Sequence, residues 1–412
     1  MKLFHIISIL VSLSAVFSYI NYRYLKLPTV IGLMLIAMLA SLSLLLLGPL
    51  TQGAEEHVGN LLASVDFNDT LLHGMLSLLL FAGALHVNLE DLAKQRWVIA
   101  ILATAGVLST TFMVGYMAYW GFGFLGLEIP LIYCLLFGAL IAPTDPIAVL
   151  GILTKAGAPK TLETKITGES LFNDGVAVVL FLVLLGIATG DGDFSALSIA
   201  GLFAQEVIGG VLYGLGIGAL AYWMLKQVDD YTVEVLITLT LTTGGYALAE
   251  SLHISAPIAI VVAGLLVGNH GRMLAMTDKT RDHLDNFWKL VDEILNAVLF
   301  VLIGMEVLVL AYQQEYLLAG LLVIPMTIIA RLAAVGLSVG LMRNFREFSP
   351  MAVTILTWGG LRGGISVALA LALPPGAIRD ALVTVTYIVV AFSIIVQGLT
   401  IGPLVKYAKR RG

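Results

Sequence analysis

Long apolar runs, separated by short polar connections, make up most of this chain. A helix needs about 20 predominantly apolar residues to cross a bilayer. Thirteen runs of roughly that length follow one another: 3–21, 27–49, 69–88, 97–120, 131–154, 166–188, 202–225, 233–251, 254–269, 292–311, 317–341, 350–373 and 381–404. The pattern predicts an all-α polytopic membrane protein with about thirteen transmembrane helices. The connection at 270–291 carries mixed charges and predicts an amphipathic surface helix.

The composition supports this class and excludes several others. Of 412 residues, 59% are hydrophobic and 12% are charged, and the mean hydropathy is +0.98. A soluble domain has roughly 25% charged residues, so neither a soluble enzyme nor a disordered chain fits. The net charge of −5 gives no basic face for nucleic acid. An outer-membrane β-barrel is also excluded, because its strands alternate apolar and polar residues and are less apolar overall than this chain. We therefore expect one transmembrane domain over 1–412 and no soluble domain.

The distribution of lysine and arginine predicts the orientation of the chain. Cytoplasmic loops of membrane proteins carry an excess of these residues. With thirteen spans, one side would hold only Lys2 and Arg379. The other would hold eighteen: Arg23, Lys26, Lys94, Arg96, Lys155, Lys160, Lys165, Lys226, Arg272, Lys279, Arg281, Lys289, Arg343, Arg346, Lys406, Lys409, Arg410 and Arg411. We expect an external N terminus and a cytoplasmic C terminus, in the cell (inner) membrane.

Two of the apolar runs are interrupted by residues that break helices. The fifth run contains Ala-Pro-Thr-Asp-Pro at 142–146, and the twelfth contains Gly-Gly-Leu-Arg-Gly-Gly at 359–364. Proline removes a backbone donor, and glycine lets the backbone unwind. Unwound backbone in mid-membrane is tolerated only where it is buried or lines a cavity. Paired interruptions of this kind are typical of the binding site of transporters with inverted repeats.

The positions of the two interruptions indicate how such repeats would be divided. Runs one to six, about 1–190, would form the first repeat, and runs eight to thirteen, about 233–404, the second, with 202–225 as linker. The fifth and twelfth runs are then equivalent and antiparallel. We expect the two discontinuous helices to cross at mid-depth.

The charges at the interruptions suit the ends of broken helices. Each break exposes a positive helix N terminus and a negative C terminus at low dielectric. We expect Asp145 to face N termini and Arg362 to face C-terminal carbonyl groups, so that both compensate helix dipoles. Thr144 adds a hydroxyl and a carbonyl oxygen that can coordinate a small cation.

The sixth run carries further polar residues, and charges inside a membrane mark functional candidates. Ser170 and Asp174 are four residues apart and share one helix face, as do Glu169 and Asn173 on the adjacent stripe. Glu169 needs a cationic partner, and Arg331 in the eleventh run needs an anionic one. We predict that these two form a structural ion pair.

These motifs together resemble one family. Thr-Asp-Pro at 144–146, Gly-Glu-Ser-Leu-Phe-Asn-Asp-Gly and its continuation at 168–181, the helix of Arg331, and Trp-Gly-Gly-Leu-Arg-Gly-Gly at the start of 358–371 are similar to sodium/proton antiporters of the NhaP type. That family is related to eukaryotic sodium/hydrogen exchangers. The resemblance spans the whole chain in order. It implies a thirteen-helix inverted-repeat fold, a homodimer, and a core ion pair between Glu169 and Arg331.

The resemblance also implies roles in ion binding. Asp174 would be the shared carrier of Na⁺ and H⁺, while Asp145, Thr144 and Ser170 would help to hold Na⁺. Asn173 would be the Asn of the Asn-Asp motif, where electrogenic relatives carry a second Asp. We expect no cytosolic regulatory tail of the kind that many relatives carry.

The residues favour a secondary antiporter that exchanges Na⁺, with Li⁺ as a further candidate, for H⁺. Burial favours the neutral form of a carboxylate, so one acid can hold either a proton or a small cation. A single titratable acid at the ion position predicts electroneutral 1:1 exchange. K⁺/H⁺ exchange and Na⁺-coupled solute symport on the same fold stay open as alternatives. Two other classes are alternatives from outside this fold. An intramembrane aspartyl protease would need two acids sharing one water. A channel would conduct ions without alternating access. No enzymatic activity and no cofactor are expected.

Overall fold

The computed structural model describes residues 3–47, 70–190, 196–271, 278–345, 348–349 and 351–411, and this part of the chain is helical without strands. Some helices contain a π-helical or 3₁₀ stretch, here labelled η. The elements are α1 Leu3–Ile20, η1 Asn21–Leu25, α2 Thr29–Leu47, η3 Thr70–Met75, α5 Leu76–Leu85, α6 Leu89–Lys94, α7 Arg96–Ile101, η4 Leu102–Gly106, α8 Val107–Phe124, α9 Leu131–Ile141, α10 Ile147–Ala156, α11 Lys160–Thr189, α12 Ala196–Leu225, α13 Tyr231–Ser251, α14 Ala256–Leu266, η5 Val267–Gly271, α16 Asp278–Met305, η6 Glu306–Leu308, α17 Gln314–Met342, α18 Ala352–Trp358, α19 Gly364–Leu371, α20 Ala377–Phe392, η7 Ser393–Gln397 and α21 Gly398–Arg411.

Among the described residues, each predicted apolar run corresponds to one helix or to two or three consecutive helical elements. Within the described residues, eight helices are long and apolar enough to cross a membrane by length and composition alone. The multi-pass, all-helical class is therefore confirmed, whereas the number of thirteen crossings and the division into two repeats stay predictions.

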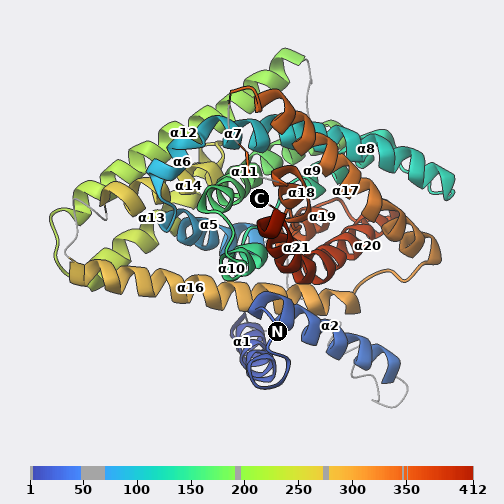
Figure 1. The fold of residues 1–412 in the computed structure, drawn as a ribbon, viewed down its shortest axis with the longest axis horizontal. Coiled ribbons are helices and arrows are strands. Elements are labelled where there is room, and N and C mark those ends of the chain that lie inside the picture. Colours follow the sequence, from blue (N-terminus) through green and yellow to red (C-terminus); the bar gives the residue numbers. More distant parts are fainter. Residues whose placement is uncertain are drawn as a thin grey trace.

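The half-helices α10, α18 and α19 and the long helix α11 occupy the middle of the molecule, and other long helices surround them. In Figure 1, α10, α11, α18 and α19 lie near the centre. The long helices α12, α8 and α17 lie toward the periphery, and α16 runs along one edge, with α1 and α2 outside it. Helices α16 and α2 pack against each other, as do α12 and α14. The polar segments of the chain are thereby enclosed by apolar helices.

Both predicted interruptions are present as breaks in the helices. The first break, residues 142–146, separates α9 from α10, and the second break, residues 359–363, separates α18 from α19. The first follows from proline chemistry, because Pro146 has no N–H to donate to the carbonyl of Ala142, four residues earlier. The four half-helices have only 11, 10, 7 and 8 residues, so each of them ends inside the protein.

The prediction of an amphipathic surface helix at 270–291 is confirmed in part: residues 278–291 are helical and combine exposed charged positions with buried apolar ones, but they do not form a separate surface helix. Residues 272–277 lie outside the described part of the chain. Residues from Asp278 onward belong to α16, a single helix of 28 residues that continues to Met305. Trp288 is fully buried. Its indole nitrogen donates a 3.1 Å hydrogen bond to the Thr238 hydroxyl, and its ring packs against Phe81. The apolar partners come from other helices, so the local pattern of charges did not reveal this burial.

Candidate functional site

The two breaks meet in the middle of the protein through their main chains. The backbone N–H of Asp145 donates a 2.7 Å hydrogen bond to the carbonyl of Leu361. The contact is close, because a Cβ atom added at Gly363 would lie 2.4 Å from Oδ2 of Asp145. Glycine at 363 is therefore required by the close approach of the two extended segments rather than by an unusual backbone angle. The extended segments lie against each other as expected for crossed discontinuous helices.

Arg362 lies in the second break and donates hydrogen bonds at the C-terminal end of α9, the helix that precedes the first break. Its Nη1 donates hydrogen bonds to the carbonyls of Ala142 at 2.6 Å and Pro143 at 2.9 Å. The first of these is the carbonyl that Pro146 leaves without its helical donor. The guanidinium is 3% exposed and compensates the negative C-terminal end of α9. Its own backbone N–H donates to the Ser393 hydroxyl at 2.9 Å.

Asp145 stands at the positive end of the next half-helix. Its Oδ1 accepts a 2.8 Å hydrogen bond from the backbone N–H of Ile147, the first residue of α10. A carboxylate in this position is stabilised by the helix dipole and by an otherwise unpaired backbone donor. One break therefore holds an acid at a helix N terminus and the other holds a base against C-terminal carbonyls.

A buried network of side chains connects the first break to α11. The hydroxyls of Thr144 and Ser170 are 2.9 Å apart, and Asn173 Nδ2 donates to the Thr144 hydroxyl at 2.9 Å. The Thr144 backbone N–H donates a longer bond, 3.4 Å, to Asn173 Oδ1. Asn173 therefore uses both ends of its amide to hold Thr144. The sequence grouped Asn173 with the ion ligands, but its contacts are those of a residue that positions a ligand.

Glu169 and Arg331 are in direct contact. Arg331 Nη1 lies 2.5 Å from Glu169 Oε1, and the two side chains are 5% and 1% exposed. Arg331 Nη2 also donates, at 3.3 Å, to the carbonyl of Leu356 near the end of α18. The pair thus joins α11 and α17 to the end of a broken helix. Removal of one partner would leave an uncompensated buried charge.

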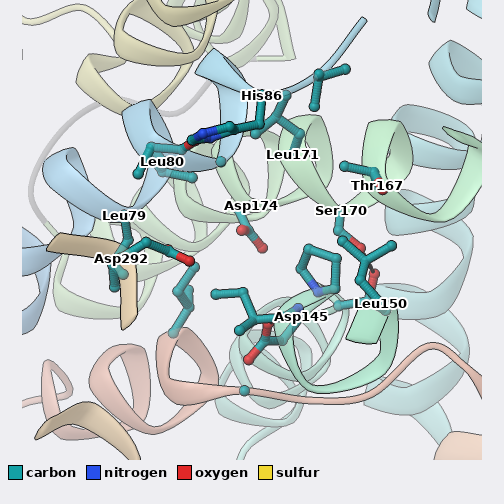
Figure 2. A pocket seen from close by; sticks show the side chains of 18 of the residues that line it. Leu79, Leu80, His86, Asp145, Leu150, Thr167, Ser170, Leu171, Asp174 and Asp292 are labelled. Atoms are coloured by element: carbon teal, nitrogen blue, oxygen red, sulfur yellow. Dashed lines mark hydrogen bonds between the residues drawn. The ribbon is translucent and has the colours of Figure 1, made fainter. Parts of the chain in front are cut away.

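A cavity of about 670 Å³ connects these polar groups with the surface. Its wall includes Thr144, Asp145, Ser170 and Asp174, which are four of the five predicted ion ligands. Figure 2 shows the labelled side chains of Asp145, Ser170 and Asp174 around this space. Among the described residues, none forms a hydrogen bond or an ion pair with the Asp174 carboxylate, which is 7% exposed. Carboxylate and hydroxyl oxygens are the ligands that small hard cations prefer.

The cavity also contains polar residues that the sequence analysis missed. Asp292 on α16 points into it, as Figure 2 shows, and His86 and Ser366 line it as well. We placed Asp292 at the first residue of a span, where a charge is ordinary. Because α16 begins at Asp278, Asp292 lies in the middle of that helix. The available signal was Asn296, which is one helical turn further and whose Nδ2 donates to Asp292 Oδ1 at 3.0 Å.

The fold and this site define a class: a multi-pass helical membrane protein with two discontinuous helices that cross beside buried carboxylates. The model of the family "Sodium/hydrogen exchanger, transmembrane" matches residues 11–407. The chain belongs to that family.

Relatives and solved structures agree with this assignment. The chain is 49% identical over 406 residues to the Na⁺/H⁺ antiporter NhaP of Pseudomonas aeruginosa, covering 97% of this chain and 96% of the relative. It is 36% identical to the Na⁺/H⁺ antiporter NhaH of Halobacillus dabanensis, with 93% of each chain covered. The structure of the sodium proton antiporter MjNhaP1 of Methanocaldococcus jannaschii matches 97% of this chain and 100% of its own with a TM-score of 0.76. At 20% identity that likeness shows the fold alone.

Proposed function

We propose that this protein is a secondary antiporter that exchanges Na⁺ for H⁺, with Asp174 as the carrier of both ions. The observation that carries the proposal is the buried Asp174 carboxylate, which has no partner in the described part of the chain and faces a cavity that also contains Ser170, Thr144 and Asp145. Curated relatives of 49% and 36% identity are named Na⁺/H⁺ antiporters, which favours Na⁺ over K⁺ as cargo.

Competition at one carboxylate is sufficient for coupling. A buried acid is stable when it is protonated or when it holds a cation, and it is costly when it is left charged and unpaired. If the empty carboxylate does not move between the two sides, each Na⁺ that leaves must be replaced by H⁺. Asp145 would help to hold Na⁺ while staying ionised against Ile147 N–H, and the hydroxyls of Thr144 and Ser170 would supply neutral oxygens.

The other residues would hold the site in place. Arg362 and Asp145 would compensate the helix ends at the crossing, Asn173 would fix Thr144, and Glu169 with Arg331 would fix α11 against α17. No organic substrate is implied by these contacts, which supports ion exchange over solute symport. No cofactor takes part in this scheme.

The orientation and assembly belong to the same proposal. The excess of basic residues on one side predicts an inner-membrane protein with an external N terminus and a cytoplasmic C terminus. Lys160 and Lys289, which lie at the exposed edge of the cavity, belong to that cytoplasmic set. The cavity would therefore open toward the cytoplasm. We also propose a homodimer, as the family resemblance implies.

Exchange by the purified protein in proteoliposomes tests the function. With a pH-sensitive dye inside, addition of Na⁺ should release protons from an acid-loaded lumen, whereas K⁺ should give no signal above empty liposomes. Li⁺ is expected to act like Na⁺ because it prefers the same oxygen ligands. A response to K⁺ equal to that to Na⁺ would contradict the proposed cargo, and no response to any of the three would contradict the antiporter assignment.

Labelling of an introduced cysteine tests the orientation. Lys409→Cys places a thiol on an exposed position of α21, while the native Cys134 is buried. An impermeant maleimide should label this variant in inside-out vesicles and not in intact cells. Labelling of intact cells would show that the terminus is external and that the number of spans is not thirteen.

A further inference from the structure

We propose that Asp292, together with Ser366, forms a second alkali-cation position in the same cavity, through which Na⁺ passes between solvent and Asp174. The proposal rests on the antiporter function above and deepens it. The residues belong to α16 and α19, and no motif of the first break or of α11 includes them.

Asp292 is located between the exposed edge of the cavity and its buried end. The neighbouring Glu293 also lines the cavity and is exposed, whereas Asp292 is half-buried and Asp174 is buried. In Figure 2 the carboxylates of Asp292 and Asp174 point toward the same space. A cation that enters along the wall would therefore meet Asp292 before it reaches Asp174.

The orientation of Asp292 is held by a buried neighbour. Asn296 is 4% exposed, and its Nδ2 donates to both the backbone carbonyl and the Oδ1 of Asp292, at 2.8 and 3.0 Å. The second of these bonds holds Oδ1 of the carboxylate and leaves Oδ2 for a ligand. Such preorganisation lowers the cost of ordering the side chain when a ligand binds.

Ser366, on a helix that packs against α16, supplies an independent sign that something binds in this cavity. Its side chain is 1% exposed and lines the cavity, yet its Oγ has no hydrogen-bond partner among the described residues. A buried hydroxyl without a partner is costly, so such groups are normally satisfied by a protein atom, water or a ligand. A hydroxyl oxygen can coordinate a Na⁺ ion that is losing its hydration shell, just as it can form a hydrogen bond with water.

The electrostatic surroundings favour a cation over an anion or a neutral solute. Asp145, Asp174 and Glu293 add negative charge to the cavity, and Asp145 and Asp292 repel each other across it. The groups near Asp292 that can carry positive charge are His86 on α5, which acts on Asp292 directly, and Lys160 and Lys289, whose exposed side chains lie at the outer edge of the cavity. The Nδ1 of His86 lies 2.8 Å from the Ala82 carbonyl. A carbonyl only accepts, so Nδ1 carries a proton, and in neutral His86 the other nitrogen, Nε2, has a free lone pair.

A staging position changes the kinetics without changing the stoichiometry. It raises the concentration of Na⁺ next to Asp174, so its loss raises the apparent KM for Na⁺ while one H⁺ is still exchanged for one Na⁺. A site of this kind contributes only weakly to the maximal exchange rate, because Asp174 carries the ion across.

The test compares Asp292→Asn with Glu293→Gln, which removes the same charge from the adjacent, exposed position. Exchange is measured in proteoliposomes as a function of Na⁺, together with the Na⁺ concentration that half-maximally stabilises the purified protein against heat. We expect Asp292→Asn to raise the KM for Na⁺ and the half-stabilising Na⁺ concentration about tenfold each, with a maximal rate close to that of the parent. Glu293→Gln should change them less than about twofold, because its charge is screened by water. Ser366→Ala should raise the KM about two- to threefold.

Several results would overturn the inference. The wild-type protein must first exchange Na⁺ for H⁺. If Asp292→Asn and Glu293→Gln then have the same KM for Na⁺, any change in KM is due to surface charge and there is no second site. Complete loss of exchange in folded Asp292→Asn would place Asp292 in the primary site. If the Na⁺ ratio at which net flux reverses depends on voltage in the wild type and no longer does so in Asp292→Asn, then Asp292 carries a proton instead. Should Asp292→Asn not fold, Asp292→Glu and Ser366→Ala decide, and a normal KM in Ser366→Ala would reject the site. Failure of the wild type to exchange would reject the proposed function itself.

Discussion

Asp145 and Leu361, 216 positions apart in the sequence, are joined by a 2.7 Å hydrogen bond between the backbone N–H of the first and the carbonyl of the second. The bond satisfies two main-chain groups that no helix satisfies, at a depth where water is scarce. It also connects the carboxylate of the first break to the glycine-rich second break. Any movement of one broken helix must therefore be transmitted to the other or must break this bond.

Replacement of the proposed carrier should abolish transport without unfolding the protein. Asp174→Asn keeps the size of the side chain but removes both the titratable group and the negative charge. We expect exchange at the level of empty liposomes, with a melting temperature at or above that of the parent, because a buried ionisable group has been neutralised. Glu315→Gln, at an exposed position of α17, is the matched control and should be fully active. Substantial exchange by Asp174→Asn would mean that another acid is the carrier.

The contact between Glu169 and Arg331 predicts strong coupling in a double-mutant cycle. Glu169→Ala and Arg331→Ala should each destabilise the protein by about 3–5 kcal/mol, since each leaves an unpaired buried charge. The double variant should recover much of the loss in melting temperature. The pair of Lys160 and Asp91, whose side chains are 2.8 Å apart and 77% and 25% exposed, is the control, and its removal should barely change the melting temperature. Additive losses for the buried pair would contradict their partnership.

The close approach at Gly363 predicts that even one methyl group there is harmful. Gly363→Ala would place a Cβ 2.4 Å from Asp145 Oδ2, so either the carboxylate or the main chain must move. We expect a loss of roughly 1–3 kcal/mol of stability and a severe loss of exchange. Gly340→Ala on α17 is the control, because a Cβ there meets nothing within 4 Å. Equal activity of the two variants would show that the crossing tolerates expansion.

Competition at Asp174 predicts how pH affects Na⁺ binding. When pH is lowered on one side, protons occupy a larger fraction of the carboxylate, so the apparent KM for Na⁺ on that side should rise. At high proton activity the slope should approach about tenfold per pH unit for one competing proton. Rates of Na⁺-dependent exchange at a series of external pH values measure it. If only the maximal rate changes while the KM stays constant, pH acts at a separate site.

The presence of Asn173 beside Asp174 predicts electroneutral exchange. One site that carries either one H⁺ or one Na⁺ moves the same charge in both directions. A carrier of two protons per Na⁺ would move one net charge, which is worth about 2.3 kcal/mol per 100 mV, or about a fiftyfold shift in the Na⁺ ratio. In proteoliposomes clamped with valinomycin, net flux should reverse where the Na⁺ ratio equals the H⁺ ratio at every voltage. A voltage-dependent reversal would identify a second proton carrier, for which Asp145 and Asp292 are the candidates.

Part of the site could be predicted because the energetic cost of its residues is local. Glu169 and Arg331 both carry a charge inside an apolar run, so each required a partner of opposite charge, and the structure brings the two together. Arg362 and the carbonyl of Ala142 follow the same logic, because proline chemistry shows which carbonyl loses its donor. Asn173 was placed less well, since its helix face is clear from the spacing but its hydrogen-bond partner on another helix is not.

The sequence by itself determined the class of protein, the order of the helices, the two breaks and the charges that belong to them, because hydropathy, proline and glycine act over a few residues. Only the tertiary structure decided that α16 runs unbroken through the expected surface segment, that Trp288 is buried, and that Asp292 faces the same cavity as Asp174. These facts depend on which helices lie side by side, and that choice is made by the packing of many apolar side chains together. A single carboxylate near the start of an apolar run looks the same in the sequence whether it ends in water or beside an ion site.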